Sequence, residues 1–281
     1  MRRVPLLLLS VQLLLAASVL AQGAATLRPF RSAMFERHPA GFYAQQARAS
    51  GKVAAAGCGD DAAWVYAYKY AQYANRRDGP RFDLDSVVAA AAAAGLTDDD
   101  FALAFLRAAH TRDFAARAAH LKRAYRDRPG HHATYTGLAA HYEVTGQQQL
   151  RDEMLRRISE AKPIPPSVVD YNYNRLNSVA ADGILLTYGD ADTFPSWLLQ
   201  ALHGHRPDVR VINWSLLAYA EGYRATVSRE LGVELPDARD EVALLDALAR
   251  TGRPVYVNLA RDRSAALEGV GDRCAVTGLA L

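Results

Sequence analysis

The segment at residues 189–195, Gly-Asp-Ala-Asp-Thr-Phe-Pro, is the most distinctive group of polar residues in the chain. Asp190 and Asp192 are separated by one residue, so both carboxylates could point into one crevice. Such a pair could bind a hard divalent cation, Mg²⁺ or Ca²⁺, together with further oxygen ligands and water. The pair could instead accept hydrogen bonds from sugar hydroxyl groups. An architectural interpretation is also open, in which Asp192 or Thr193 caps the following helix and Asp190 fixes the preceding turn.

The candidate ligand-binding residues share one block of sequence, and the two carboxylates are also the candidate metal ligands. They are Asp190, Asp192, Thr193, Trp197 and Asn213. No catalytic residue is assigned, because the sequence has no GxSxG elbow, P-loop or GxGxxG phosphate-binding loop. We expect Ser196 to cap a helix or to lie on the surface. The histidine pairs 131/132 and 203/205 lack the spacing of metal ligands on one helix face, so we expect solvated side chains.

The elements that must position these side chains alternate between strands and helices. They are a strand at 184–187, a helix at 195–202, a strand at 209–213, a helix at 242–249 and a strand at 254–259, with a final strand expected at 274–281. This alternation with short loops predicts a small parallel α/β sandwich. Ligands in such sheets collect beyond the carboxyl ends of the strands, where Asp190 and Asp192 would lie.

Residues 61–163 have the pattern of helices. Tyr66, Tyr70 and Tyr73 fall on one helical face, which favours a packed core over a ligand-stacking surface. Thr97 is expected to cap a helix, with Asp100 completing a capping box and the run at 98–100 facing the positive helix end. These roles account for three adjacent carboxylates without a metal ion.

Residues 101–163 carry a weak internal repeat with an interval of 34 residues. The related pairs are Phe101 and Tyr135, Leu121 and Leu155, and Pro129 and Pro163. The interval and the spacing of the second unit resemble a tetratricopeptide repeat. Arg151 departs from that pattern, because the family usually has a small residue there. The fold class is therefore α + α/β: a helical-hairpin (tetratricopeptide-like) region followed by the sandwich.

Prolines at 163, 165 and 166 stop helix propagation and mark the expected domain boundary. The predicted organisation is a signal peptide at 1–21, an irregular lead-in at 22–60, a helical domain at 61–163 and an α/β domain at 164–281. The N-terminus has the pattern of a secretory signal peptide, with Arg2 and Arg3 before an apolar run and a cleavage site near Ala21. This pattern indicates export to the periplasm or beyond. The alternative for this run is a membrane anchor. After cleavage the mature chain would have no membrane-spanning segment.

Composition narrows the classes of partner. The chain is 50% hydrophobic and 22% charged, with a formal net charge of +3, which excludes a wholly disordered chain and argues against nucleic acid as the partner. Cys58 and Cys274 could form a disulfide in an oxidising compartment or remain two separate thiols. There is no CxxC pair to build a thiolate metal site.

The block that carries the heptapeptide is similar to a known region. Residues 189–195, Trp197, the segment 206–211 (Arg-Pro-Asp-Val-Arg-Val) and Asn213 resemble the extracytoplasmic C-terminal region of bacterial multi-pass membrane proteins related to protein O-mannosyltransferases. In that region the motif is Gly-Asp-Asn-Asp-Thr-(Phe/Tyr)-Pro, so Ala191 is a departure. The resemblance extends over roughly residues 175–281. It implies only an accessory domain, because transferase chemistry is assigned to the membrane-embedded part of those proteins.

Two functions remain open from the sequence. The favoured one is an exported non-catalytic binding or scaffold protein of the bacterial envelope, accessory to a glycosylation or surface-assembly system, whose helices bind an envelope protein or peptide. The alternative is a metal-dependent enzyme or sugar-binding module that uses Asp190 and Asp192 on a glycoconjugate. The missing catalytic set favours the first, so we lean against an enzyme.

Overall fold

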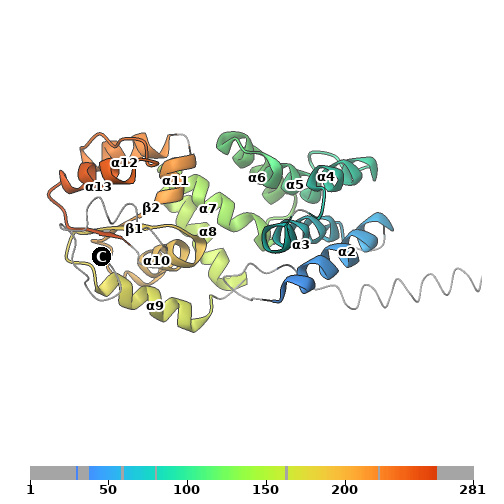
Figure 1. Ribbon diagram of the computed structural model, residues 1–281, viewed down its shortest axis with the longest axis horizontal. Coiled ribbons are helices and arrows are strands. Elements are labelled where there is room, and N and C mark those ends of the chain that lie inside the picture. The colour runs from blue at the N-terminus through green and yellow to red at the C-terminus, as the bar shows by residue number, and fades with distance from the viewer. Residues whose placement is uncertain are drawn as a thin grey trace, which may run out of the picture. The chain divides into compact units, whose positions relative to one another are not determined.

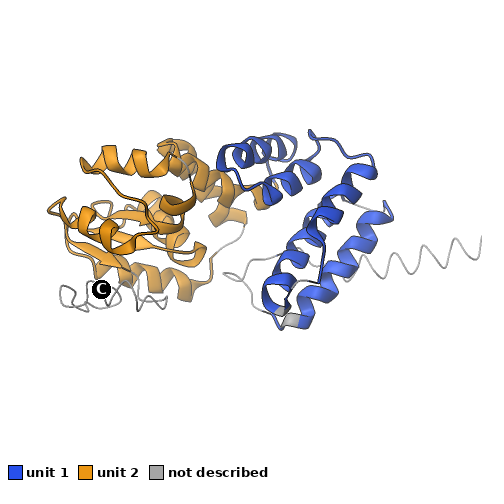
Figure 2. Ribbon diagram, turned by 45° about the horizontal axis from the view of Figure 1, so that its top comes forward, with its two compact units in different colours: residues 1–130 blue, residues 131–281 orange. Residues whose placement is uncertain are grey.

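A computed structural model describes residues 30, 38–57, 60–79, 81–161, 164–220 and 222–257. The chain divides into two compact units, residues 1–130 and 131–281 (Figure 2). Several expectations lie outside the described residues: the signal peptide and its cleavage site, both cysteines, Pro163, the final strand and the end of the resemblance. No helix in the described ranges is long and apolar enough to cross a membrane.

The first unit is a set of helices that pack in antiparallel pairs. Its described helices are α2 (Ala40–Ala55), α3 (Ala62–Asp78), α4 (Leu84–Ala93), α5 (Phe101–His110) and α6 (Phe114–Asp127). Helix α2 lies in the segment expected to be irregular, and that expectation was wrong there. The reason is its inward face: Tyr43, Ala44 and Ala47 are buried, and together they pack against α3.

The aromatic residues of α3 belong to the core, as the sequence predicted. Tyr70 is buried with Phe30 and Tyr43, and Tyr66 and Tyr73 pack partly buried against the same cluster. The ring centroids of Phe30 and Tyr70 lie 5.2 Å apart in an edge-to-face arrangement. This geometry is the one that aromatic pairs favour in protein interiors, so the tyrosines stabilise the α2–α3 pair.

The acidic run before α5 has structural partners, although the cap differs from the one expected. Asp100, not Thr97, is the N-cap residue, and its carboxylate accepts hydrogen bonds from the backbone N–H and hydroxyl of Thr97 at 2.6 and 2.7 Å. Asp98 pairs with Arg107 at 2.8 Å. These contacts order the turn into the helix and explain the run without a cation.

Within its described residues, the second unit places three strands between layers of helix (Figure 1). Its elements are η1 (His132–Thr134), α7 (Tyr135–Val144), α8 (Gln148–Ala161), α9 (Pro166–Asn177), β1 (Ile184–Thr187), α10 (Asp190–His203), β2 (Arg210–Asn213), α11 (Trp214–Tyr219), α12 (Tyr223–Leu231), α13 (Glu241–Ala249) and β3 (Val255–Val257). The strand order is β2-β1-β3, and both pairings are parallel. Helices α9 and α10 lie on one side of the sheet and α11–α13 on the other. The predicted α + α/β class is thereby confirmed.

The hairpin of α7 and α8 belongs to the second unit, although the proline cluster was the expected boundary. Glu143 of α7 is buried and accepts hydrogen bonds from Arg151 of α8 at 2.6 Å and from Arg210 of β2 at 2.9 Å. The hydroxyl of Tyr223 in α12 donates to the same carboxylate at 2.9 Å. Glu143, which also binds Arg151, the departure from the repeat pattern, therefore connects the hairpin to the α/β elements.

Gly183 stands where the chain enters β1, and its missing side chain permits close packing. A Cβ atom there would lie 2.5 Å from Val179 Cγ1 and 3.0 Å from the carbonyl oxygen of Ala180. We expect Gly183→Ala to lower the free energy of unfolding by about 1–3 kcal/mol through overpacking. Gly51→Ala, inside α2 with nothing within 4 Å, is the control and should be neutral or stabilising by up to about 1 kcal/mol. Urea unfolding measures both, and an unchanged Gly183→Ala midpoint would contradict the close approach.

Candidate functional site

The turn from β1 into α10 is the part of the sheet where a ligand site is expected. The chain leaves β1 for β2 on one side and later returns to β3 on the other, so the strand order reverses at β1. Such a reversal marks the usual crevice at the carboxyl ends of an open α/β sheet. Gly189 and Asp190 are exposed at this point, and Asp190 is the first residue of α10.

Asp192 faces the backbone of the turn. It is 8% exposed, and its Oδ2 and Oδ1 atoms accept hydrogen bonds from the N–H groups of Tyr188 at 2.9 Å and Gly189 at 2.6 Å. The bond to Gly189 joins the third residue of α10 to the N-cap position, which is half of a capping box. A carboxylate near the positive helix end is also favoured by the helix dipole. This geometry corresponds to the architectural alternative for Asp192.

Thr193 and Asn213 form a buried hydrogen-bonded group between the two longer strands. The Thr193 hydroxyl lies 2.8 Å from the hydroxyl of Thr187 at the end of β1 and accepts from Asn213 Nδ2 at 2.7 Å. Asn213 Oδ1 accepts from the N–H of Leu216 at 2.8 Å, which caps α11. These side chains therefore hold β1, β2, α10 and α11 in register.

Trp197 packs against β2, away from solvent. It is 1% exposed, and its indole Nε1 donates to the carbonyl of Val211 at 3.3 Å. The guanidinium of Arg151 lies over the indole ring, 5.9 Å from the centroid, which is within cation–π range. Trp197 thus connects α10 to the α7–α8 hairpin.

The candidate residues consequently divide into a buried group and an exposed one. Asp192, Thr193, Trp197 and Asn213 are buried and bonded to neighbouring elements, whereas Asp190 is exposed. In the part of the chain that the structure describes, no group of three or more His, Cys, Asp or Glu side chains is placed to hold a metal ion.

A buried arginine on α9 was missed from the sequence. Arg175 is 0% exposed, and its Nη2 donates to Asn172 Oδ1 at 2.6 Å, to Ser196 Oγ at 2.9 Å and to the carbonyl of Asp192. Burial lowers the pKa of this guanidinium, and the charge of Asp192 opposes the effect. Ser196 is therefore buried, and the expectation of a capping or surface hydroxyl was wrong. The signal was the spacing of Asn172 and Arg175 with Leu176, which places them on one inward helix face.

Asn172 explains why α10 begins at Asp190 and not near Pro195. Pro195 has no N–H group to donate to the carbonyl of Ala191, four residues earlier in the helix. Asn172 Nδ2 donates to that carbonyl at 3.0 Å. The α9 side chain therefore replaces the missing helix hydrogen bond, and the whole heptapeptide from Asp190 onward can be helical.

The histidines contribute to local structure. His131 Nδ1 accepts from the N–H of Ala133 at 3.3 Å at the start of η1, and His205 stacks on Tyr173 with ring centroids 4.1 Å apart. His203 is exposed at the end of α10.

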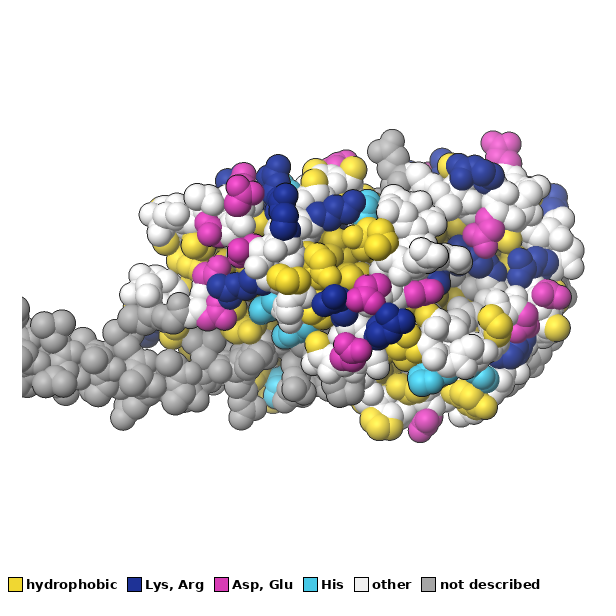
Figure 3. All heavy atoms as spheres, turned by 180° about the vertical axis from the view of Figure 1, so that it is seen from behind, with side chains coloured by type: hydrophobic (Ala, Val, Ile, Leu, Met, Phe, Trp, Pro, Cys, Tyr) yellow, Lys and Arg dark blue, Asp and Glu magenta, His cyan; other side chains and the backbone are white. Residues whose placement is uncertain are grey.

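On the face drawn in Figure 3, basic and acidic side chains are interspersed along the surface.

Comparison with known proteins gives one partial match. Residues 168–231, from α9 to α12, match the family described as TMEM260-associated domain 2. The matched range includes the heptapeptide, Trp197 and Asn213, and the match fits the resemblance to proteins related to O-mannosyltransferases. No curated protein and no solved structure matches the chain.

Proposed function

We propose that this chain is an exported, non-catalytic binding or scaffold protein of the bacterial envelope, accessory to a glycosylation or surface-assembly system. The observation that carries the proposal is the use of the heptapeptide's polar groups inside the fold. Asp192 binds two backbone N–H groups, and Thr193 and Asn213 bind each other between strands. Groups engaged in this way position secondary structure and are not free to act on a substrate.

The partial family match supports the envelope and glycosylation part of the proposal. The match spans 168–231, and in the proposed assignment the motif marks an accessory domain that works beside a membrane transferase. The basic and apolar N-terminus supports export. The helical hairpins would supply the surface that binds an envelope protein or peptide.

A metal or sugar site on Asp190 and Asp192 would require Asp192 to leave the N–H groups of Tyr188 and Gly189. The test is calorimetric titration of the wild type and of Asp190→Ala with Ca²⁺ and Mg²⁺. We expect neither protein to give saturable heat, because two carboxylates, one of them bonded to the backbone of the turn, supply fewer oxygen ligands than either cation requires. Saturable binding by the wild type that Asp190→Ala abolishes would favour the metal-dependent alternative.

The binding role is tested in the producing bacterium. An affinity-tagged chain is crosslinked in situ with two reagents of different chemistry, and any protein enriched by both is purified and mixed with the purified chain. We expect a complex of fixed stoichiometry by light scattering, and the Asp190→Ala variant should form it equally well. A chain that crosslinks to no protein, or only to proteins with which it forms no purified complex, would refute a binding role.

A further inference from the structure

Two adjoining surface hollows lie along helix α12 of the second unit. One has a volume of about 540 Å³ and lies between the later turns of α12 and the loop at 232–235. The other, about 350 Å³, lies where the end of α11 meets the start of α12 and the segment at 237–239. Arg224 and Ala225 line both hollows, so the two are adjacent.

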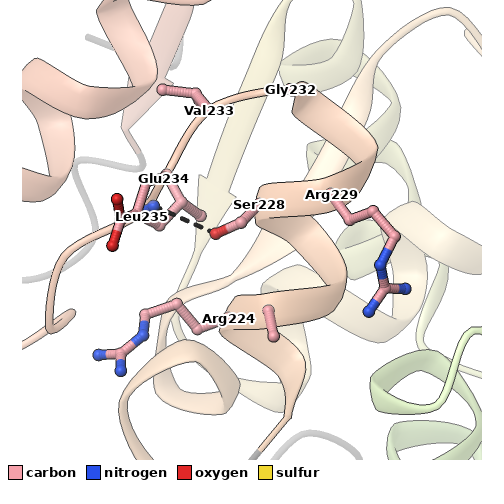
Figure 4. Close-up of a pocket in the computed structure, with 8 residues that line it drawn as sticks. Arg224, Ser228, Arg229, Gly232, Val233, Glu234 and Leu235 are labelled. Atoms are coloured by element: carbon pink, nitrogen blue, oxygen red, sulfur yellow. Dashed lines mark hydrogen bonds between the residues drawn. The ribbon is translucent and has the colours of Figure 1, made fainter.

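The walls of both hollows are held by internal hydrogen bonds. The N–H of Leu235 donates to Ser228 Oγ at 3.1 Å, which fixes the loop against α12 (Figure 4). Trp214 Nε1 donates to the carbonyl of Ala238 at 2.7 Å, which fixes the segment beside the second hollow. Leu235 and Ala238 are buried. The hollows are therefore formed before any ligand arrives, which lowers the entropic cost of binding.

Three arginines and two carboxylates, Glu234 and Asp237, line the hollows, so the lining carries one net positive charge, and Arg224 also lowers the pKa of Asp237 through its charge. Arg239 bonds to Asp237 through Nε at 3.0 Å and Nη2 at 2.6 Å, and this bond holds the pKa of Asp237 at about 2, so the pair is neutral overall. Arg224 and Arg229 form no hydrogen bond or ion pair within the described ranges, and Figure 4 shows them projecting to opposite sides of α12. A guanidinium presents two parallel N–H donors that match a carboxylate.

Apart from the charged residues and Ser228, the side chains that line the hollows are apolar or aromatic. Leu217 and Ala220 line the second hollow, and Val233 and Leu235 line the first. Tyr219, which also lines the second hollow, is 78% exposed and is the most exposed large hydrophobic residue in the described part of the chain. Exposed tyrosine and arginine are the residue types that contribute most binding energy at protein interfaces.

We propose that the hollows around α12 bind an acidic segment of a partner protein. Arg224 would bind a carboxylate between the hollows, apolar side chains on either side of it would enter them, and Tyr219 would cover one of these side chains. The apolar lining favours a peptide over a polyanionic saccharide, which has no apolar side chains to place there. This proposal rests on the proposed binding function and adds the surface and the partner's chemistry.

The test uses fluorescence anisotropy with a fluorescein-labelled peptide, Ser-Leu-Glu-Asp-Leu-Gly repeated twice. We expect saturable binding by the full chain, weakened at least tenfold by Arg224→Glu. Arg250→Glu is the matched control, because Arg250 is exposed, forms no side-chain bond within the described ranges and lines neither hollow, and it should change the dissociation constant less than twofold. The same peptide with Gln for Glu and Asn for Asp should bind at least tenfold more weakly. Both substituted arginines are exposed, and circular dichroism confirms that the variants fold.

Three results would overturn the proposal: no saturable binding of the acidic peptide by the wild type, equal weakening by Arg224→Glu and Arg250→Glu, or a heparin oligosaccharide that binds more tightly than the peptide and depends on Arg224. Binding of Arg224→Glu to the crosslinked partner tests this surface separately from the proposed binding function. If Arg224→Glu still forms the purified complex with that partner as tightly as the wild type, the chain is a binding protein that uses a different surface. If no partner exists, the proposed function itself fails.

Discussion

Glu143→Ala is expected to lower the free energy of unfolding of the second unit by about 3–5 kcal/mol. Glu143 is 4% exposed and accepts hydrogen bonds from Arg151, Arg210 and Tyr223. Its removal takes the shared counter-charge from two largely buried guanidinium groups, while Arg151 keeps Asp152 at 2.8 Å and Arg210 keeps Glu230 at 2.7 Å. Removing one partner of a buried ion pair costs more stability than the intact pair contributes, because the remaining charge stays out of water. Urea unfolding followed by tryptophan fluorescence measures the loss, and Trp197 beside Arg151 is a local reporter.

Glu153→Ala in α8 is the matched control for Glu143→Ala. Glu153 also contacts two arginines, Arg156 at 2.6 Å and Arg157 at 2.9 Å, but these pairs are solvent-exposed. Exposed pairs contribute little, so the control should lose less than about 1 kcal/mol. Similar losses in the two variants would show that burial of Glu143 has no energetic consequence and would contradict the prediction.

The contribution of Glu143 should also depend on pH. Burial raises its pKa, but attraction to Arg210 and Arg151 outweighs burial and leaves the pKa below the ordinary value of 4.5. A carboxyl whose pKa is lower in the folded state stabilises the fold at pH values above the unfolded pKa, and this contribution is lost as the pH falls through the folded pKa. The stability difference between the wild type and Glu143→Gln should therefore be constant at neutral pH and shrink below about pH 4.5. A difference that grows on acidification would contradict this sign.

The sequence predicted strands β1 and β2 and helix α13 of the second unit, because alternation and helical spacing are local signals, whereas helices α9, α11 and α12 were not predicted. The strand at 184–187 and the second strand ending at Asn213 agree with the structure. The place of the α7–α8 hairpin could not be predicted in this way. Arg151 was recognised as a departure from the repeat, but its partner Glu143 lies on another helix and also pairs with Arg210 of β2, and pairing across a fold is not encoded in spacing.

The candidate site also depends on contacts between separate elements, which the spacing of residues does not reveal. Asp192 and Thr193 were singled out from the sequence, and capping was among the interpretations left open. The helix was expected to begin near Pro195, since proline favours the first helical turn. That rule failed because Asn172, on a separate helix, supplies the hydrogen bond that the proline lacks. Inward-facing polar residues such as Asn172 and Arg175 are visible in the sequence only as unusual members of a buried helix face.

Asp192→Ala is expected to lower the free energy of unfolding by about 2–4 kcal/mol, because it leaves the N–H groups of Tyr188 and Gly189 without their charged acceptor at the end of the central strand. Asp192→Asn keeps one acceptor oxygen and should lose less. Asp190→Ala, at the exposed start of the same helix, is the matched control and should change stability by less than about 0.5 kcal/mol. Urea unfolding at neutral pH gives all three values.

The same three variants separate a structural role of Asp192 from ligation of a cation. An ion that binds only the folded protein raises the unfolding midpoint, and the increase grows with the ratio of the ion concentration to its dissociation constant. If Asp192 served chiefly as a metal ligand, Ca²⁺ would raise the midpoint of the wild type, and Asp192→Ala would abolish that increase. Because its two oxygens already bind backbone N–H groups, we expect Ca²⁺ to shift the wild type and Asp192→Ala equally, while the loss of stability in Asp192→Ala persists with or without the ion. A Ca²⁺-dependent increase confined to proteins that retain Asp192 would show that the carboxylate leaves the turn to bind metal.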